Sequence, residues 1–359
     1  MRSKSPMGSV PCPVEWDTNM SVLVTGGNGF LGSEICRMLV ARGIDVISLQ
    51  RSTVPEPARL PGVEYLSGDV SNRSSVDDAM DGVDTVFHVA AKAGMWGKSA
   101  DYERINVDGT RNVVNACLMH GVKRMVYTST PSVVFNGEPI CGWDERTPYG
   151  QNWLCDYARS KCEAEQIALD PAHRGQLPVV ALRPHLIWGV GDPNLIPRLV
   201  ARAQAGRMIR VGDGTNRVDI THVANAAHAH LCAYDVLMRD PEKVSGKAYF
   251  ISDGNPVILW DWIQGLFDRL GLPEVKRSLP LGLVYRMAGV AEWVYRSLNL
   301  SAEPPMTRWV AVELAKDHFF DISAARNELG YEPVVGMEEG LRTLVASMQP
   351  NTNRTIGGH

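Results

Sequence analysis

The sequence predicts an α/β protein: a doubly wound parallel sheet followed by a smaller C-terminal lobe. Three observations lead to this fold class. Apolar runs of strand length alternate with helical patterns through the first half of the chain, as in parallel sheets. A glycine-rich turn joins the first apolar run to the first helical pattern. The second half has shorter elements and more Trp and Pro, which is typical of a smaller lobe.

The elements follow the apolar runs in order. The first strand is expected at 21 to 26 (SVLVTG), and its helix over 30 to 42 ends at Gly43, a residue that favours helix termination. A helix over 101 to 120 ends in the same way at Gly121, and a later helix carries DYARSK at 156 to 161. The other strands are IDVISL, VEYL, DTVFHVA at 84 to 90, MVYTST at 125 to 130 and VVALRP at 179 to 184.

The composition describes an ordinary globular protein. Of 359 residues, 45% are hydrophobic and 21% charged, and a net charge of -4 gives no reason to expect nucleic acid as a partner. The seven cysteines are scattered without a C-x-x-C pair or metal-ligand spacing, so we expect reduced thiols, a cytoplasmic location and no metal site.

The chain has no segment that predicts a membrane anchor. Residues 1 to 19 lack the apolar run of a signal peptide and are expected to form a flexible arm. No window reaches the about 18 uncharged apolar residues of a membrane span. The stretch at 281 to 300 is interrupted by Arg286, Glu292 and Arg296, so it predicts an amphipathic helix that packs on its own protein or a partner.

The turn TGGNGFLG at 25 to 32 predicts a dinucleotide site. Gly26 permits a tight turn, Gly29 lets backbone amides approach a pyrophosphate, and Gly32 lets the helix pack close to the sheet. The N-terminus of that helix then faces the anion. A lone glycine pattern is weak evidence, but its place at the first junction between a strand and a helix makes it specific.

The end of the second strand indicates which dinucleotide is preferred. An acidic residue at this place bonds the ribose 2′-hydroxyl of NAD, but here the sequence reads Leu49, Gln50, Arg51, Ser52. No carboxylate stands there to repel a 2′-phosphate, and Arg51 can hold one through charge-assisted hydrogen bonds. We therefore expect NADPH or NADP+ rather than NAD(H), with a surface arginine as the alternative.

DYARSK places Tyr157 and Lys161 on one helical face, where the ammonium is expected to lower the pKa of the phenol. The same spacing occurs at ordinary helix surfaces, so the context decides. Ser129 and Thr130 end the fifth strand, at the edge where parallel sheets present ligands. A hydroxyl there can donate to a substrate oxygen while Tyr157 transfers its proton.

With these motifs in place, the sequence resembles the extended short-chain dehydrogenase/reductase family from Met20 to about Ala346. TGGNGFLG, GDV at 68 to 70, HVAA at 88 to 91, NVDGTRNV at 106 to 113, YTST, YARSK and LRPHLIWG at 182 to 189 fall in the order of that family. The resemblance implies a Rossmann fold, Thr130 as the catalytic hydroxyl with Ser129 as the reserve, and Asn106 as a holder of a water that relays protons to Lys161.

The resemblance also assigns the cofactor contacts and the domains. It places Asp69 and Val70 at the adenine, and Ala90, Ala91 and Pro184 on the nicotinamide side. We expect a dinucleotide-binding domain at 20–183 plus about 215–250, a substrate lobe at 184–214 and 251–346, and a tail at 347–359. The full set of expected cofactor contacts is Gly26, Gly29, Phe30, Leu31, Gly32, Arg51, Asp69, Val70, Ala90, Ala91, Lys92, Tyr157, Lys161, Pro184 and Ile187.

Longer segments resemble one branch of the family more closely. HVAAKAGMWG, YTSTPSVVF, ALRPHLIWGVGDP and GDGTNRVDITHVANAAHAH are similar to the 3β-hydroxysteroid dehydrogenase-like branch, and within it to bacterial reductases of 2-alkyl-3-oxoalkanoates in long-chain olefin biosynthesis. This implies NADPH-dependent reduction of a long-chain 2-alkyl-3-keto acid. It also implies a homodimer, paired through the helices at 101–120 and 152–170, and an assembly with other olefin-pathway enzymes.

A substrate with two alkyl chains and a carboxylate needs a wide apolar cleft and a cation. The cleft is expected to be lined by Met95, Trp96, Trp143, Trp153, Trp188 and the helix at 281–300. Lys92, His185 and Arg308 are the candidate partners of the carboxylate, with His185 favoured because it follows Pro184. A structural histidine is the alternative.

Three other functions remain open. A sterol dehydrogenase of the same branch would oxidise a 3β-hydroxyl, with or without loss of a neighbouring carboxylate. A nucleotide-sugar epimerase or dehydratase would share the triad but retain NAD; Pro131 and Ser132 after Thr130 disfavour the dehydratase pattern of Asp-Glu. A dinucleotide-sensing regulator without turnover is disfavoured because both Tyr157 and Lys161 remain.

Overall fold

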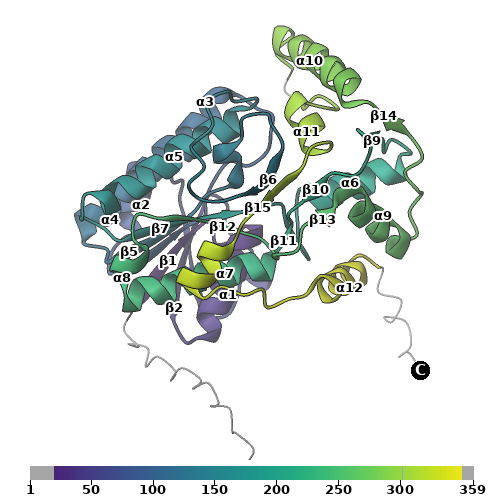
Figure 1. The fold of residues 1–359 in the computed structure, drawn as a ribbon. Coiled ribbons are helices and arrows are strands. Elements are labelled where there is room, and N and C mark those ends of the chain that lie inside the picture. The colour runs from purple at the N-terminus through teal and green to yellow at the C-terminus, as the bar shows by residue number, and fades with distance from the viewer. Residues whose placement is uncertain (1–19, 301, 350–359) are drawn as a thin grey trace, which may run out of the picture.

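The computed structural model describes residues 20–300 and 302–349 and contains one large parallel sheet (Figure 1). Its seven strands lie in the order β12-β7-β5-β4-β1-β2-β3. The strands are β1 (Ser21–Thr25), β2 (Asp45–Gln50), β3 (Val63–Ser67), β4 (Thr85–His88), β5 (Arg124–Thr128), β7 (Val179–Pro184) and β12 (Ala248–Ile251). The predicted fold class, a doubly wound parallel sheet, is confirmed.

Helices cover both faces of the sheet, and the alternation of side chains along a strand explains why. Val22 and Val24 of β1 belong to the apolar cluster that includes α1 (Phe30–Ala41) and α7 (Val223–Arg239). Leu23 between them belongs to the cluster that includes α4 (Gly109–His120) and α5 (Asp156–His173). Figure 1 shows α4 and α5 on one side of the sheet and α1 and α7 on the other. Burial on both faces accounts for the continuous apolar runs of these strands.

The strand order reverses between β1 and β4. From β1, the chain proceeds outward through β2 and β3, then returns to β4 on the other side and proceeds outward again. In such sheets the loops at the carboxyl ends of the strands on either side of the reversal diverge and leave a crevice for ligands. The loops after β1, β4, β5 and β7 therefore carry the candidate site.

The helix predicted over 101 to 120 is not regular. It consists of α3 (Ser99–Tyr102), a π-helical turn (Glu103–Asp108) and α4. The π-helical turn carries the buried Asn106, whose side chain bonds to a neighbouring loop instead of facing solvent. Such turns are frequent at functional sites, and local sequence pattern does not reveal them.

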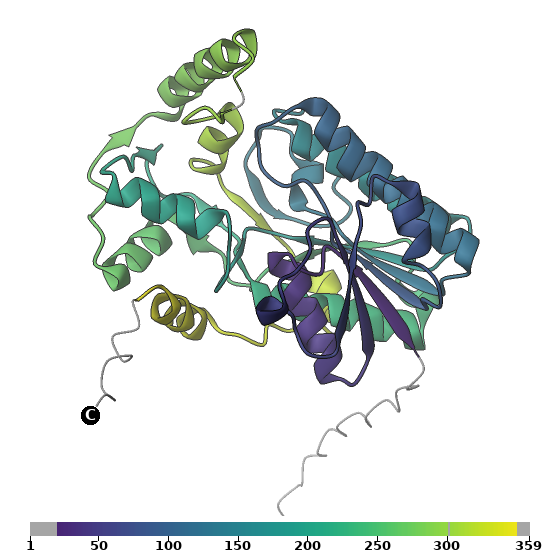
Figure 2. The ribbon, with the colours of Figure 1, turned by 180° about the vertical axis from the view of Figure 1, so that it is seen from behind.

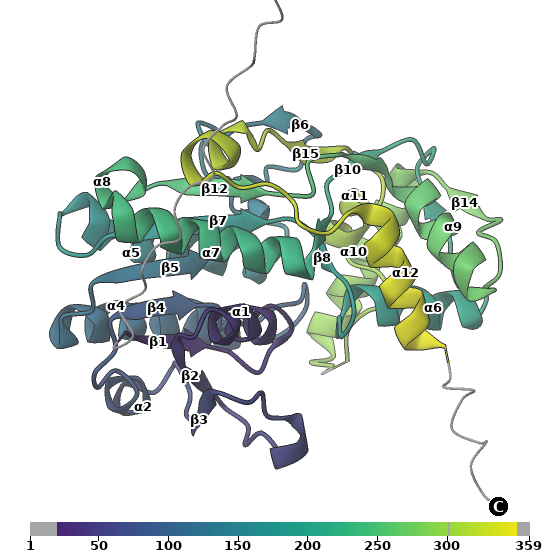
Figure 3. The ribbon, with the colours of Figure 1, turned by 90° about the horizontal axis from the view of Figure 1, so that it is seen from below.

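The second lobe lies beside the carboxyl edge of the sheet (Figure 3). Its helices are α6 (Leu195–Gln204), α9 (Leu259–Leu270), α10 (Leu281–Ser297), α11 (Arg308–Glu313) and α12 (Met337–Met348). A small sheet of β13 (Val257–Ile258), β10 (Arg217–Val218), β15 (His318–Phe320) and β6 (Ile140–Trp143) lies next to it. Two strand pairs complete the lobe: β8 (Ile187–Trp188) with β11 (Thr221–His222), and β9 (Arg210–Val211) with β14 (Ser278–Leu279). Short helices also lie at α2 (Arg73–Asp78) and α8 (Pro241–Val244), with 3-10 turns at Glu56–Ala58 and Pro131–Val134 and a π-helical turn at Ala325–Leu329.

The domain boundaries given by the sequence stay a prediction, and the arm at 1–19 lies outside the described residues. The chain does cross between the two parts more than once. It leaves the large sheet after β7, returns for α7 and β12, and leaves again for α9 to α12.

Helix α10 lies at the periphery of the molecule next to α11 (Figure 2). Its inner face carries Val284, Ala288 and Glu292, and the buried Glu292 carboxylate accepts a hydrogen bond from Arg308 Nε at 2.8 Å. Three apolar side chains on its outer face are exposed: Leu283, Val290 and Trp293. Among the described residues, no helix is both long enough and apolar enough to cross a membrane.

Candidate active site

A cavity of about 1360 Å³ lies at the carboxyl edge of the sheet and extends into the second lobe. The glycine turn after β1 and the strand ends of β4, β5 and β7 form one part of its wall. Helices α6, α10 and α11 form the other part. The candidate residues from the sequence can therefore be compared with the wall of a single site.

The glycine turn has the close approaches that its sequence predicts. Gly26 adopts a φ of +71°, in the left-handed region that favours glycine, and its carbonyl accepts a hydrogen bond from the Gly29 amide at 2.8 Å. Gly29 precedes the first turn of α1. A Cβ added at Gly32 would stand 2.2 Å from the Gly26 carbonyl oxygen. The turn brings Phe30 and Leu31 to the cavity wall with the glycines.

Replacing Gly32 by Ala is expected to disrupt this turn. The added methyl group would meet backbone atoms that have no rotamer to change, so the first turn of α1 must move away from Gly26. We expect at least about a tenfold loss of dinucleotide affinity and a loss of about 1–3 kcal/mol in the free energy of unfolding. Nucleotide titration and urea unfolding measure both, with Gly282→Ala as the control, because no atom lies within 4 Å of that position. An unchanged affinity in the Gly32 variant would contradict the assignment.

A buried histidine supports the loop after β4. The Thr25 hydroxyl accepts hydrogen bonds from the amides of Val89 at 3.1 Å and Ala90 at 3.2 Å, so its proton points to His88 Nδ1 at 2.7 Å. His88 Nε2 lies 3.0 Å from the Thr110 hydroxyl. Burial, and then the charge of Lys161, lower the pKa of His88 to about 3, so this ring stays neutral. The network fixes the loop that carries Ala90 and Ala91 at the cavity.

Asn106 holds the same loop from the opposite side. Its Oδ1 accepts from the Lys92 amide at 2.7 Å, and its Nδ2 donates to the Lys92 carbonyl at 3.2 Å and to the Ser160 hydroxyl at 2.9 Å. Both donors of the amide are used within the protein. The contacts give Asn106 a positioning role, and the predicted water relay to Lys161 stays a prediction.

At the adenine end of the expected site, the acidic residue Asp69 follows β3 and the cationic residue Arg51 follows β2. Asp69 and Val70 line the cavity after β3. Burial acts to raise the pKa of Asp69, but hydrogen bonds from the backbone and hydroxyl of Ser71 and the charge of Arg104 lower it overall. Arg51 follows β2, is exposed and also lines the cavity, and its guanidinium makes no hydrogen bond or ion pair with another described residue.

Tyr157 and Thr130 lie together in the wall. Tyr157 is in the first turn of α5, and Thr130 lies two residues after the end of β5. Burial raises the pKa of the Tyr157 phenol to about 12, and a hydrogen bond with Thr130 acts in the opposite direction. Ser129 is also at the wall and contributes to lowering the pKa of the buried Glu165. The geometry thus gives Thr130 the contact with the phenol and leaves Ser129 next to another group.

Lys161 lies at the wall next to Tyr157, but its ammonium points elsewhere. Its Nζ donates to the Tyr127 hydroxyl and the Thr128 carbonyl, both at 2.7 Å, and burial lowers its pKa to about 7. The prediction that this ammonium lowers the pKa of Tyr157 is wrong for this structure, because burial outweighs every other influence on the phenol. Tyr127, which holds Lys161, was missed by the sequence analysis although it belongs to the YTST motif.

A buried ion pair beneath the site was also missed. Glu165 and Arg183 form two hydrogen bonds, at 2.9 and 2.5 Å, and both side chains are almost completely buried. The Tyr149 hydroxyl donates to the Glu165 carboxylate at 2.7 Å. The negative charge of Glu165 raises the pKa of Lys161 against the effect of burial. The spacing of Tyr157, Lys161 and Glu165, four residues each, is the signal that could have found this residue.

The apolar wall differs from the one predicted. Met95 and the α10 residues Val284, Met287, Ala288 and Ala291 line the cavity. Trp96, Trp143, Trp153 and Trp188 do not line it. Trp188 is fully buried against the edge of Trp262, and Trp96 packs against Tyr295. The tryptophans at the wall are Trp262 and Trp309, which come from α9 and α11.

Of the three residues predicted to bind the substrate carboxylate, two line the cavity and one does not. Lys92 and His185 line the cavity, as do Pro184 and Ile187. Arg308 lies outside it and is bound to Glu292, so the structure does not place it as a partner for a substrate. Three arginines that the sequence analysis did not single out line the cavity: Arg198, Arg202 and Arg207. The first two are one helical turn apart in α6, a spacing visible in the sequence.

Comparisons with known proteins agree with this arrangement. Residues 23–281 match the model of the 3-beta hydroxysteroid dehydrogenase/isomerase family. A 2-alkyl-3-oxoalkanoate reductase of Stenotrophomonas maltophilia is 44% identical over 330 residues, which are 91% of this chain and 99% of the relative. An enzyme of the same name from Shewanella oneidensis is 44% identical over 331 residues, 90% of this chain and 85% of the relative. The 3beta-hydroxysteroid-dehydrogenase/decarboxylase isoform 1 of Arabidopsis thaliana is 33% identical over 366 residues, which are 94% of this chain and 83% of the relative.

Solved structures share the fold. MoeE5 in complex with UDP-glucose and NAD matches with a TM-score of 0.69 and 26% identity, over 91% of this chain and 98% of that one. The crystal structure of gox2253 matches with a TM-score of 0.73 and 28% identity, over 92% and 97%. The family model and the relatives each cover most of the chain. The chain therefore belongs to the 3-beta hydroxysteroid dehydrogenase/isomerase family, within the short-chain dehydrogenases/reductases, and is an oxidoreductase acting on CH–OH and C=O groups.

Proposed function

We propose that this chain uses NADPH to reduce the C3 ketone of a long-chain 2-alkyl-3-oxo acid to the 2-alkyl-3-hydroxy acid. The observation that supports it most is the shared wall of one cavity. The glycine turn, Thr130, Tyr157 and Lys161 line the same space as a long run of apolar side chains from the second lobe. The names of the two relatives that are 44% identical point to the same substrate class.

The residues at the sheet edge fit a dinucleotide. Gly26, Gly29 and Gly32 have no side chains in the approach to the first turn of α1, and MoeE5, which shares the fold, is described as bound to NAD. Gly26, Gly29 and Gly32 would face the pyrophosphate, Asp69 and Val70 the adenine, and Ala90, Ala91 and Pro184 the nicotinamide. When bound, NADPH supplies the hydride.

The side chains at the wall account for the proton. Thr130 and Tyr157 donate hydrogen bonds to the carbonyl oxygen, which orients the ketone and stabilises the charge that develops on it. Tyr157 then gives its proton to this oxygen. Lys161 is held by Tyr127 and Thr128 at the same wall, and with a pKa of about 7 it is partly protonated at neutral pH.

Tyr157 is in the protonation state that ketone reduction requires at the start of the reaction. With a pKa of about 12, Tyr157 is protonated throughout the neutral range and is a proton donor rather than an acceptor. A dehydrogenase acting on an alcohol needs the phenolate at the start of its reaction. A group held as an acid therefore suits a ketone reductase.

The second lobe suits two alkyl chains. The cavity of about 1360 Å³ includes the expected dinucleotide site at the sheet edge and continues between apolar side chains of the second lobe. Its wall includes Leu199, Val211 and Ile263 in addition to the side chains of α10. Hydrocarbon buried against such a wall contributes about 0.8 kcal/mol for each CH₂ group, so long chains can determine specificity.

The proposed function also has a location, an oligomeric state and partner enzymes. We propose a cytoplasmic homodimer, paired through α4 and α5, that works with other enzymes of olefin biosynthesis. Helix α4 exposes two apolar side chains, Leu118 and Met119, which suits a pairing surface. The oligomeric state in solution is measured by sedimentation equilibrium.

Substrate competition tests the reaction. NADPH oxidation is followed with a 2-alkyl-3-oxo acid and with a 3-keto sterol under the same conditions. Conversion of a nucleotide sugar, which would consume no NADPH, is followed by chromatography of the sugar product. We expect turnover with the oxo acid, and kcat/KM for the sterol lower by at least about a hundredfold, because its rigid rings adapt to the apolar wall less well than two flexible alkyl chains. Faster turnover of the sterol would support the alternative, a 3β-hydroxysteroid dehydrogenase.

Replacing Arg51 by Ala tests the cofactor. A charge-assisted bond to a phosphate contributes about 1.5–3 kcal/mol, so the dissociation constant for NADPH is expected to rise about tenfold to a hundredfold. The constant for NADH, which has no 2′-phosphate, should stay within about twofold. Arg174→Ala is the matched control, because Arg174 is exposed at the end of α5 and outside the cavity wall. Equal effects on both dinucleotides would remove Arg51 from the site.

A further inference from the structure

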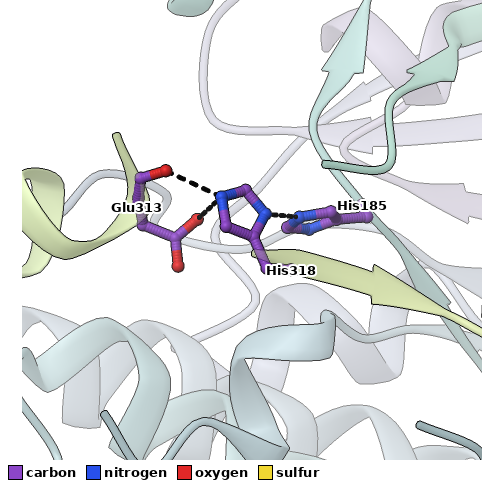
Figure 4. Close-up of side chains that lie close together, drawn as sticks. All are labelled: His185, Glu313 and His318. Atoms are coloured by element: carbon purple, nitrogen blue, oxygen red, sulfur yellow. Dashed lines mark hydrogen bonds and ion pairs between the residues drawn. The ribbon is translucent and has the colours of Figure 1, made fainter. Parts of the chain in front are cut away.

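His185, His318 and Glu313, which come from distant parts of the sequence, form a chain of polar contacts beside the cavity (Figure 4). His185 Nε2 lies 2.6 Å from His318 Nδ1. His318 Nε2 lies 2.7 Å from the Glu313 carbonyl oxygen and 3.6 Å from Oε2 of the same residue. All three residues line the cavity, and the two histidines are almost completely buried. The catalytic roles proposed for Tyr157, Thr130 and Lys161 do not use this chain.

The contacts fix where the protons lie. His318 Nε2 faces two oxygen acceptors on Glu313, so it carries the hydrogen. His318 Nδ1 is then the acceptor, and His185 Nε2 must donate to it. The neutral His185 ring therefore has its unprotonated Nδ1 on the side away from His318. A second proton on this ring can only be placed at Nδ1.

The backbone holds His185 at the edge where the substrate is expected. Its amide donates to the Ile251 carbonyl at 3.1 Å, and its carbonyl accepts from the Thr221 hydroxyl at 2.5 Å. The next residue, Leu186, has a φ of +35°, a strained conformation for a leucine that is typical of functional segments. Thr128 of β5 pairs with Leu182 of β7, so Thr130 and His185 leave adjacent strands at the same edge.

A metal site is the other use of two histidines and a glutamate, and the ligand atoms of these three lie within 4.8 Å of one another. Their arrangement is a line and not a cage. The two imidazole nitrogens already face each other at 2.6 Å, with room for a proton between them. Glu313 lies at the far nitrogen of His318 (Figure 4), so the three donors do not converge on one point.

We propose that the chain His185, His318 and Glu313 binds the carboxylate of the substrate together with one proton taken from solvent. The proton is placed on His185 Nδ1, where it bonds the carboxylate. His185 Nε2 continues to donate to His318, and the Glu313 carboxylate stabilises the added positive charge from the far end. This inference rests on the proposed function and adds how the acid group is recognised.

The surrounding charges support proton uptake on binding rather than a permanent charge. Burial, and then the neighbouring His318, hold the pKa of His185 well below its ordinary value, so the free ring is neutral. The groups that act on the pair from neighbouring elements are acidic: Glu313 from α11, and Asp219 between β10 and β11. Burial raises the pKa of Asp219 to about 6 and also raises that of Glu313. A carboxylate entering the cavity supplies the negative charge that makes protonation of His185 favourable.

Calorimetry measures the proton directly. The probe is a stable hydroxy acid of the product class, 2-octyl-3-hydroxydodecanoic acid. It is titrated into the protein with NADP+ at about pH 7.5, in buffers that differ in ionisation enthalpy, so that the heat reports the number of protons taken up. We expect uptake of about one proton by the wild-type protein, and an affinity that falls about tenfold for each unit of pH through the neutral range. His185→Gln should abolish the uptake and remove this slope. Uptake that is absent in the wild type, or equal in both proteins, would overturn the proposal.

Four further measurements distinguish a failure of carboxylate recognition from a folding defect and from a failure of the proposed function. The methyl ester of the same hydroxy acid has no charge to neutralise, so His185→Gln should change its affinity by less than about threefold. His318→Gln should reduce proton uptake as well, because His185 then loses the ring that connects it to the Glu313 carboxylate, and the added positive charge is stabilised less. His173→Gln is the control, because His173 is exposed on α5 and outside the cavity. Absence of NADPH oxidation with the oxo acid in the wild type would instead count against the proposed function.

Discussion

Replacing Tyr157 by Phe is expected to lower kcat for ketone reduction by about a hundredfold to ten-thousandfold, the usual contribution of a positioned general acid. The phenol is half-buried in the cavity wall and is protonated at neutral pH, since its pKa is about 12. The variant keeps the ring and its packing but has no proton to give. Residual turnover would use water as the acid.

The measurement separates chemistry from binding. Single-turnover oxidation of NADPH gives the rate of the chemical step, and nucleotide titration gives the dissociation constant, which should stay within about threefold of the wild-type value. Tyr295→Phe is the matched control: it removes the same hydroxyl group from α10, outside the cavity wall. Retention of most activity by the Tyr157 variant would show that another group supplies the proton.

Replacing Glu165 by Ala is expected to cost about 3–5 kcal/mol in the free energy of unfolding, the largest stability effect that the site offers. Arg183 is 4% exposed, and its guanidinium would lose the only carboxylate with which it forms an ion pair among the described residues. An unpaired buried charge is much less favourable than the pair. Tyr149 would lose its acceptor as well. The midpoint of urea unfolding measures the loss.

The pH dependence of this effect has a definite sign. The charge and hydrogen bonds of Arg183 oppose burial and lower the pKa of Glu165 below its ordinary value near 4.5. A group whose pKa is lower in the folded state stabilises the protein above its unfolded pKa, and this contribution is lost as the pH falls through the folded value. The stability difference between the wild type and Glu165→Gln should therefore narrow below about pH 4.5.

Glu163→Ala is the control for both measurements. Glu163 lies on the same helix, is 44% exposed and pairs with Arg159 at 3.6 Å on the surface. Exposed pairs of this kind contribute about 0–1 kcal/mol, so its removal should change the unfolding midpoint little. If the Glu163 and Glu165 variants lose similar amounts of unfolding free energy, the buried ion pair contributes no more to stability than an exposed pair on the same helix.

The sheet and the glycine turn could be predicted from the sequence, and the triad of Thr130, Tyr157 and Lys161 stays a prediction from it. These depend on patterns that are local in the chain. Strands buried on both faces are continuous apolar runs, the approach of a helix to a phosphate needs glycines at fixed places, and two side chains on one helical face are four residues apart. Each pattern can be recognised within about ten residues, and the resemblance to a family depends on the same short segments.

Only the tertiary structure decided what surrounds these groups. The partners of Lys161 are a hydroxyl and a carbonyl on β5, and the neighbours of His185 come from a strand more than a hundred residues away. Burial, which sets the pKa values of Tyr157 and Lys161, depends on elements from the whole chain. The same holds for Arg308, a predicted substrate ligand that is bound by Glu292 instead. Electrostatic environment is a property of three-dimensional packing, so a pattern along the chain indicates which groups react but not how their protons and charges are arranged.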